Sequence, residues 1–381
     1  MLPVAIITTW LLLTFLLGAT VGSFLNVVIG RLPKEKSILW PGSRCGACLQ
    51  PIPWYHNLPI VSYLWLKGRC GKCGARFSPR YLIVEALCGL SFAGLYYAEM
   101  VVNIHNWPLG NRAWAFAYGL PPPSWWLGYI FHATLFSFLF AASVCDLDGM
   151  EIPLSLTMTG TLIGLIGAVL LPWPWPWMPA EATPRALVPA GVPGLGPFIV
   201  QPGSEWRAGS IGEGVYPWPV AGPLPEWLAP GGNFQTGLAT GLAGALAGTF
   251  LARFVGFVFS AALGKEALGL GDADLLMMAG AFVGWQVVVA AFFISVFPGL
   301  LFGIIQAIFV RGGHFPFGPS LAGGVLIALL GWHWIGPYLQ PVLFDAWFLM
   351  ILTVARRLMM AVLGFALTRI TQGGPRPEEA S

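Results

Sequence analysis

The chain has 381 residues, of which 56% are hydrophobic and only 9% are charged, and its formal net charge is +3. Soluble domains carry about 25% charged residues, so this composition excludes an ordinary soluble globular protein. A membrane-spanning helix needs about 20 mostly apolar residues, and many such runs follow one another here. We therefore expect an all-α polytopic membrane protein with eight or nine transmembrane helices. The runs begin near Leu2, Tyr81, Trp125, Ile152, Gln235, Asp274, Val296, Phe317 and Pro341.

The first apolar run, residues 1–22, has no basic segment before it and no small-residue cleavage site before Gly22. A removed signal peptide would carry both features, so we expect a retained transmembrane helix. The stretch that follows, Gly22–Pro33, contains small residues that permit close helix packing. Two arginines, Arg356 and Arg357, interrupt the ninth run and make it the weakest of the predicted spans.

Residues 23–80 are polar and strongly basic, with nine Lys and Arg residues against one acid, Glu35, which gives a net charge of +8. Basic loops stay in the cytoplasm. We therefore expect this segment inside and the N-terminus outside. When the sides are alternated along the chain, Asp146 and Asp272 both fall at the cytoplasmic surface.

Four cysteines in this basic segment form two Cys-x-x-Cys pairs separated by 21 residues, a spacing typical of a tetrahedral zinc site. The alternative is two disulfides, which require an oxidising compartment and so conflict with a cytoplasmic loop. A glycine after the first cysteine of each pair, Gly46 and Gly71, is expected to let the backbone turn. Four protein ligands leave no position for water, so the zinc is predicted to be structural. The ligands are Cys45, Cys48, Cys70 and Cys73.

The rest of the chain divides by composition. Transmembrane helices are expected over residues 81–171 and again over 235–370. Between them, residues 172–234 form a Pro-, Gly- and Trp-rich insertion that the alternation of sides places outside the membrane. The last residues, 371–381, are predicted to be a disordered tail.

Two aspartates stand out because charge is otherwise avoided in the apolar runs. Asp146 lies at the end of one run, and Asp272 lies in Gly269-Leu-Gly-Asp272 at the start of another. Acids at a membrane boundary are costly to desolvate and usually functional. Two neighbouring carboxylates cannot both ionise easily, so one acts as base while the other donates a proton. Asp148 is the alternative to Asp146 as the first aspartate of this pair.

Other reactive side chains give weaker signals. Cys88 and Cys145 stand alone in apolar surroundings and are expected to be packing residues. Glu151 and Glu266 are expected to be solvated or to tune the aspartate pair. The histidines have no spacing that predicts a metal site, and we interpret them as structural or surface residues. These are His56, His105, His132, His314 and His333.

Four features of the chain fit one pattern: the paired cysteines, Asp146 seven residues before Pro153, Gly269-Leu-Gly-Asp272 and Phe315-Pro-Phe-Gly-Pro319. Together they resemble the type IV prepilin peptidases, which are bacterial membrane aspartyl proteases. The resemblance covers most of the chain and favours Asp146 over Asp148. It implies cleavage of prepilins and pseudopilins after a glycine at the cytoplasmic face of the bacterial inner membrane. It also implies N-methylation from S-adenosylmethionine, with Glu85 as a candidate cofactor-binding residue.

Besides these substrates, we expect membrane lipid as a partner and no nucleic acid. The sequence departs from the family pattern at Leu154, where an acid or amide is usual, and at Asp274, where lysine is usual. Two alternatives stay open. One is a transporter whose acids bind a cation or proton. The other, which Asp274 keeps open, is a scaffold that binds prepilins without cutting them.

Overall fold

The computed structural model describes residues 2–105, 123–171, 234–263, 268–309 and 316–343. All regular structure in these ranges is helical, and the only β-type pairings within them are two isolated bridges. The long helices are α1 (Leu2–Arg31), α3 (Arg80–Tyr96), α5 (Pro123–Leu147), α6 (Leu154–Leu170), α7 (Phe234–Leu263), α8 (Leu270–Ile294), α9 (Val296–Phe309) and α10 (Gly318–Leu343). Each begins near one of the first eight predicted runs.

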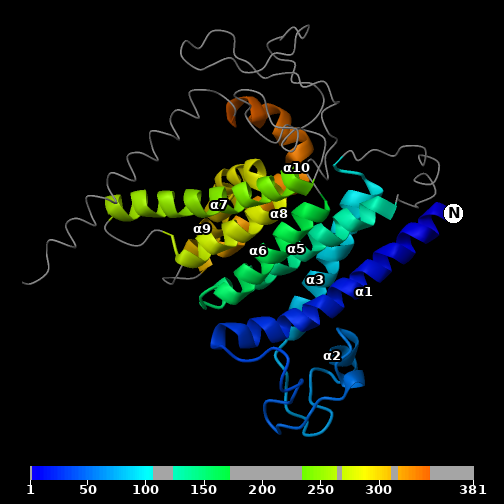
Figure 1. Cartoon of the computed structure of the whole chain (residues 1–381). Coiled ribbons are helices and arrows are strands. Elements are labelled where there is room, and N and C mark those ends of the chain that lie inside the picture. Colours follow the sequence, from blue (N-terminus) through cyan, green and yellow to red (C-terminus); the bar gives the residue numbers. More distant parts are fainter. Residues whose placement is uncertain (1, 106–122, 172–233, 264–267, 310–315, 344–381) are drawn as a thin grey trace, which may run out of the picture.

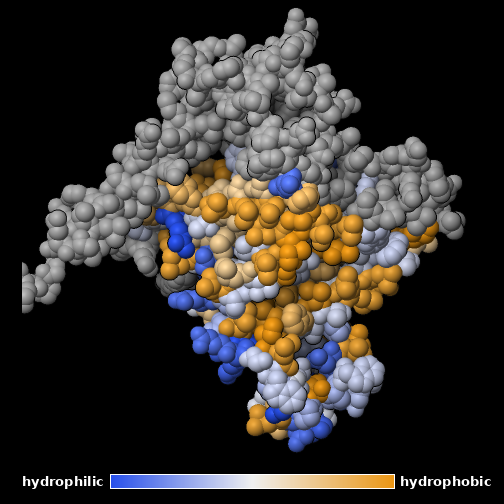
Figure 2. Space-filling model, in the orientation of Figure 1, coloured by the Kyte–Doolittle hydropathy of each residue, from blue (hydrophilic) through white to orange (hydrophobic). Residues whose placement is uncertain are grey.

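The helices pack into one bundle, with the small domain that contains α2 (Val61–Trp65) at one end (Figure 1). Figure 2 shows an apolar band across the helices and more hydrophilic surface at the end with the small domain. Six stretches of the described residues are long and apolar enough to cross a membrane. One of them covers α8 and most of α9, and the 17-residue α6 is shorter. The predicted number of eight or nine spans therefore stays a prediction.

Helix α8 lies at the centre of the bundle and touches α5, α6, α7, α9 and α10. It is apolar around most of its circumference, and most of its side chains beyond the first turn are buried, as expected for a helix surrounded by others. It packs most extensively on α7, where a Cβ atom at Gly244 would collide with the backbone of Gly280. This central helix begins two residues before Asp272.

The first helix continues beyond Gly22 to Arg31, so it extends into the segment 23–80 that was predicted to be the domain of the four cysteines. Gly22 faces a neighbouring helix: a Cβ atom there would lie 2.9 Å from the Cα of Glu85 on α3. Asn26, one turn later, also contacts the neighbouring helix, because its side-chain amide donates to the Tyr81 carbonyl at 3.2 Å. A 30-residue helix is about 45 Å long and exceeds the roughly 30 Å apolar core of a bilayer, so its last turns reach the small domain.

Several predictions fall outside the described residues. These are the structure of the insertion and tail over 172–233 and 371–381, the ninth span beyond residue 343, and the environments of Glu266 and His314.

Candidate functional site

The four cysteines of the two pairs come together in the small domain, which we call the cysteine domain. Their sulfur atoms all lie within 4.8 Å of one another, and the Sγ atoms of Cys45 and Cys73 are 3.8 Å apart. Four sulfurs at about 2.3 Å from a tetrahedral zinc ion would be separated by about 3.8 Å. All six cysteines of the chain are free thiols. The cluster therefore fits a zinc ion, and the alternative of two disulfides is not found.

Each cysteine pair sits in a tight turn closed by backbone hydrogen bonds. Leu49 N–H donates to the Cys45 carbonyl, and Gly74 N–H donates to the Cys70 carbonyl, both at 2.9 Å. The left-handed residues are Leu49 (φ 57°) and Gly74 (φ 72°), which follow the second cysteine of each pair. Gly46 and Gly71, which were expected to let the backbone turn, do not have positive φ angles.

Backbone hydrogen bonds favour the thiolate form at two of the four cysteines, Cys45 and Cys70. Hydrogen bonds from the backbone N–H groups of Cys48 and Ala47 lower the pKa of the Cys45 thiol to about 6. The corresponding backbone groups of Cys73 and Lys72 lower the pKa of Cys70. Since thiolates are the form that binds metal, the turns prepare these two side chains as ligands.

Asp146 lies in the last turn of α5 and points to the start of α10. Its Oδ2 accepts a hydrogen bond from Gly318 N–H at 2.7 Å. Gly318 belongs to the Pro-Phe-Gly-Pro segment, and a Cβ atom there would lie 2.8 Å from the same oxygen. The glycine therefore allows a backbone donor to approach and orient the Asp146 carboxylate.

Asp272 occupies the first turn of α8. Its Oδ2 accepts from Gly269 N–H at 3.2 Å, and its own N–H donates to the Gly269 carbonyl at 3.2 Å. The Asp272 carboxylate thus caps the first turn of the helix, and the positive end of the helix dipole also favours an acid there. Helix capping alone would explain an acid at residue 272, so a catalytic role also requires the segment that carries Asp146 to lie nearby.

The segments that carry the two aspartates touch each other. A Cβ atom at Gly271, next to Asp272, would lie 3.2 Å from the Cβ of Ile152, in the connection that follows Asp146. In the same connection, Asp148 pairs with Arg80 at the start of α3, beside the cysteine domain. These contacts bring the C-terminal end of α5 and the N-terminal ends of α3, α8 and α10 to one end of the bundle.

The unusual acid Asp274 has a partner on the neighbouring helix. Its Oδ1 lies 3.9 Å from the Arg253 guanidinium of α7, and the two side chains are 18% and 59% exposed. A positive charge is therefore present near this position, although on α7 rather than at residue 274.

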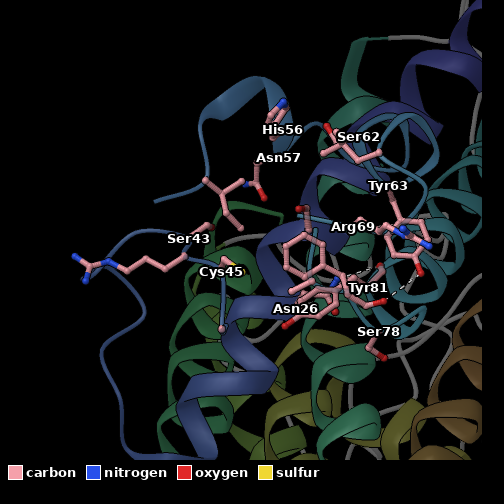
Figure 3. Close-up of a pocket in the computed structure, with 18 of the residues that line it drawn as sticks. Asn26, Ser43, Cys45, His56, Asn57, Ser62, Tyr63, Arg69, Ser78 and Tyr81 are labelled. Atoms are coloured by element: carbon pink, nitrogen blue, oxygen red, sulfur yellow. Dashed lines mark hydrogen bonds between the residues drawn. The ribbon is translucent and has the colours of Figure 1, made fainter. Parts of the chain in front are cut away.

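Glu85 lines a cavity of about 600 Å³ between α1, α3 and the cysteine domain. Its Oε2 accepts from Ile60 N–H at 2.8 Å. Figure 3 shows Asn26 of α1, Tyr81 of α3 and Tyr63 and Arg69 of the domain around the cavity. A volume of this size is typical of small-molecule sites, and the aromatic, amide and charged groups can hold a polar cofactor.

Two histidines interpreted as structural or surface residues are instead brought together with an acid. His105 and His132 both contact Glu99 inside the bundle, and all three are buried. Glu99 and His105 are six residues apart in irregular spacing after α3, and His132 lies on α5, so residue spacing gave no signal for this cluster. Cys88 and Cys145 are buried, in agreement with packing roles.

The fold and these groups define a multi-pass membrane protein with a four-thiol metal domain and carboxylates at helix ends. Comparison with known proteins agrees with the resemblance given by the sequence. Residues 16–99 match the bacterial peptidase A24 N-terminal domain, and residues 227–304 match the type IV leader peptidase family. These two matches confirm the resemblance to the type IV prepilin peptidases. The first match contains the four cysteines and Glu85, the second contains Asp272, and Asp146 lies between them.

Curated relatives agree with this resemblance. A prepilin leader peptidase/N-methyltransferase of Myxococcus xanthus is 30% identical over 77% of this chain and 62% of the relative. The protein of the same name from Stutzerimonas stutzeri is 28% identical over 84% of this chain and 90% of the relative. An Escherichia coli type 4 prepilin-like proteins leader peptide-processing enzyme is 29% identical over 81% of this chain. No solved structure matches the chain.

Proposed function

We propose that the chain is a membrane aspartyl endopeptidase that removes the leader peptide of prepilins and pseudopilins. The observation that carries the proposal is the meeting of the Asp146 and Asp272 segments at one end of the bundle, in a chain that matches the type IV leader peptidase family. The cytoplasmic face, the external N-terminus and cleavage after a glycine are parts of the same proposal.

The proposed chemistry needs one carboxylate and one carboxylic acid. The carboxylate takes a proton from water, which attacks the scissile carbonyl carbon, while the acid donates its proton to the carbonyl oxygen. Collapse of the tetrahedral intermediate breaks the C–N bond and passes a proton to the leaving amine. Gly318 N–H orients Asp146, and Gly269 N–H orients Asp272. Arg80 engages Asp148, which supports Asp146 as the reacting acid.

We further propose that the cavity beside Glu85 binds S-adenosylmethionine, which when bound supplies a methyl group to the new amino terminus. The tyrosine rings can pack on an adenine, and the Glu85 carboxylate can face ribose hydroxyls or the sulfonium charge. The Arg69 guanidinium can meet the cofactor's carboxylate. The cavity lies at the end of the bundle where Arg80 pairs with Asp148, two residues after Asp146.

Mass spectrometry of a prepilin co-expressed with the chain tests both proposals at once. We expect a cut after the glycine that precedes the hydrophobic helix, together with the mass gain of one methyl group. A cut without the methyl group would reject the methyl-transfer proposal only. A prepilin that binds but stays whole would favour the non-catalytic scaffold.

A further inference from the structure

A second cluster of metal-binding side chains lies inside the helix bundle. Glu99, His105 and His132 each offer one ligand atom, and these atoms lie within 4.8 Å of one another. Glu99 Oε1 is 2.6 Å from Nδ1 of His132 and 3.2 Å from Nε2 of His105. The exposed fractions of the three residues are 0%, 3% and 2%, for Glu99, His132 and His105.

The local backbone is shaped to bring these groups together. Glu99 lies in the π-helical turn Tyr97–Val101 that ends α3, and such turns are frequent at functional sites. Asn103 then adopts φ 55°, and Ile104 N–H donates to the Ala98 carbonyl at 3.0 Å, so the chain folds back and places His105 beside Glu99.

Helix α5 supplies the third side chain from a fixed position. Tyr129, one turn before His132, donates its hydroxyl hydrogen to the Phe92 carbonyl of α3 at 3.1 Å. The rings of Tyr129 and Tyr96 also meet edge to face, with centroids 6.2 Å apart. These contacts hold α5 against α3 so that His132 faces Glu99.

Hydrogen bonds among the three residues leave one atom unexplained. Glu99 Oε1 is within hydrogen-bonding distance of both imidazoles, but Oε2 is buried without a hydrogen-bond partner. A buried carboxylate oxygen without a partner is costly. A cation bound to Oε2 would remove that cost, and two imidazoles with one carboxylate form a familiar ligand set for zinc and related divalent transition metals.

We propose that Glu99, His105 and His132 bind a divalent transition metal ion, with zinc as the best fit, at a site separate from the cysteine cluster and the aspartates. His132 and Asp146 are 14 residues apart on α5, a distance of about 21 Å at 1.5 Å per residue. Helix α3 leads from the cysteine domain to this cluster, which therefore lies away from that domain (Figure 1). The ion would clamp the end of α3 to α5.

Zinc content and zinc coordination of the purified full-length protein in detergent test the proposal. We expect two zinc ions per chain, one for each cluster. Zinc-edge X-ray absorption should show sulfur neighbours at about 2.3 Å and nitrogen or oxygen neighbours at about 2.0–2.1 Å. Wild-type protein saturated with zinc but showing sulfur neighbours alone would overturn the proposal and leave a hydrogen-bonded network only.

Variants of the two clusters show which side chains bind each zinc ion. The double variant Cys45→Ser/Cys73→Ser should keep one zinc with no sulfur neighbours, and Glu99→Gln/His132→Gln should keep one zinc with sulfur neighbours only. Glu151→Gln, at an exposed residue in the connection between α5 and α6, is the control and should keep both ions. If Glu99→Gln/His132→Gln retains both ions, the proposal is wrong. If that variant does not fold, the wild-type spectrum still decides.

Discussion

At the residue scale, the orientation of Asp146 depends on a neighbour with no side chain. Gly318→Ala should lower prepilin cleavage by up to about 100-fold, because a misplacement of about 1 Å at a reacting group can cost that much. Its Cβ would lie 2.8 Å from Asp146 Oδ2. Gly323→Ala, on the same helix, is the control, since its Cβ would meet only Pro298 at 3.8 Å. Equal cleavage rates in the two variants would contradict the proposed positioning of Asp146.

Asp148 and Arg80 form an ion pair whose side chains are 27% and 43% exposed. Exposed pairs contribute about 0–1 kcal/mol, so Asp148→Asn should lower the unfolding temperature slightly and leave prepilin cleavage within a few-fold of wild type. A double-mutant cycle with Arg80→Gln, followed by thermal unfolding, measures the coupling. Loss of all cleavage in Asp148→Asn would move the first catalytic role from Asp146 to Asp148.

At the scale of elements, the contact between α1 and α3 depends on small residues. Gly22→Leu should destabilise the protein by about 1–3 kcal/mol, because overpacking forces neighbouring backbone to move, and a Cβ there already approaches Glu85 and Cys88 to 2.9 Å. Gly30→Leu on the same helix has nothing within 4 Å of its Cβ and should be neutral or slightly stabilising. Thermal unfolding in detergent compares the two, and equal unfolding temperatures would argue against this packing.

The cysteine domain is proposed to hold zinc for structure rather than for peptide hydrolysis. Cys45→Ser/Cys73→Ser should lose the thiol-bound zinc and loosen the cavity beside Glu85, which Cys45 also lines. We therefore expect methylation of the product to fall more than cleavage, as measured by mass spectrometry of the processed prepilin. A variant that methylates normally while cleavage disappears would reverse this assignment.

At the scale of the whole molecule, the sequence predicted the parts that follow from local patterns. Apolar runs located the starts of eight helices, and Cys-x-x-Cys spacing predicted the four-thiol cluster. Two features could not be predicted from the sequence because they depend on packing between different segments. One is the length of helix α1, which continues to Arg31 and contacts α3 at Gly22 and Asn26. Glu99, His105 and His132 meet only through a π-helical turn and a fold-back of the chain.

The whole account depends on Asp146 and Asp272 acting together on one peptide bond. The most direct test compares cleavage of a purified prepilin by wild type, Asp146→Asn, Asp272→Asn and the control Asp148→Asn, with correct folding checked by thermal unfolding. General acid–base catalysis contributes about 10²–10⁴-fold, so each of the first two amides should lose at least about 100-fold, while the control stays active. The double variant should be no worse than either single variant. Cleavage at the wild-type rate by either Asp146→Asn or Asp272→Asn would contradict the account.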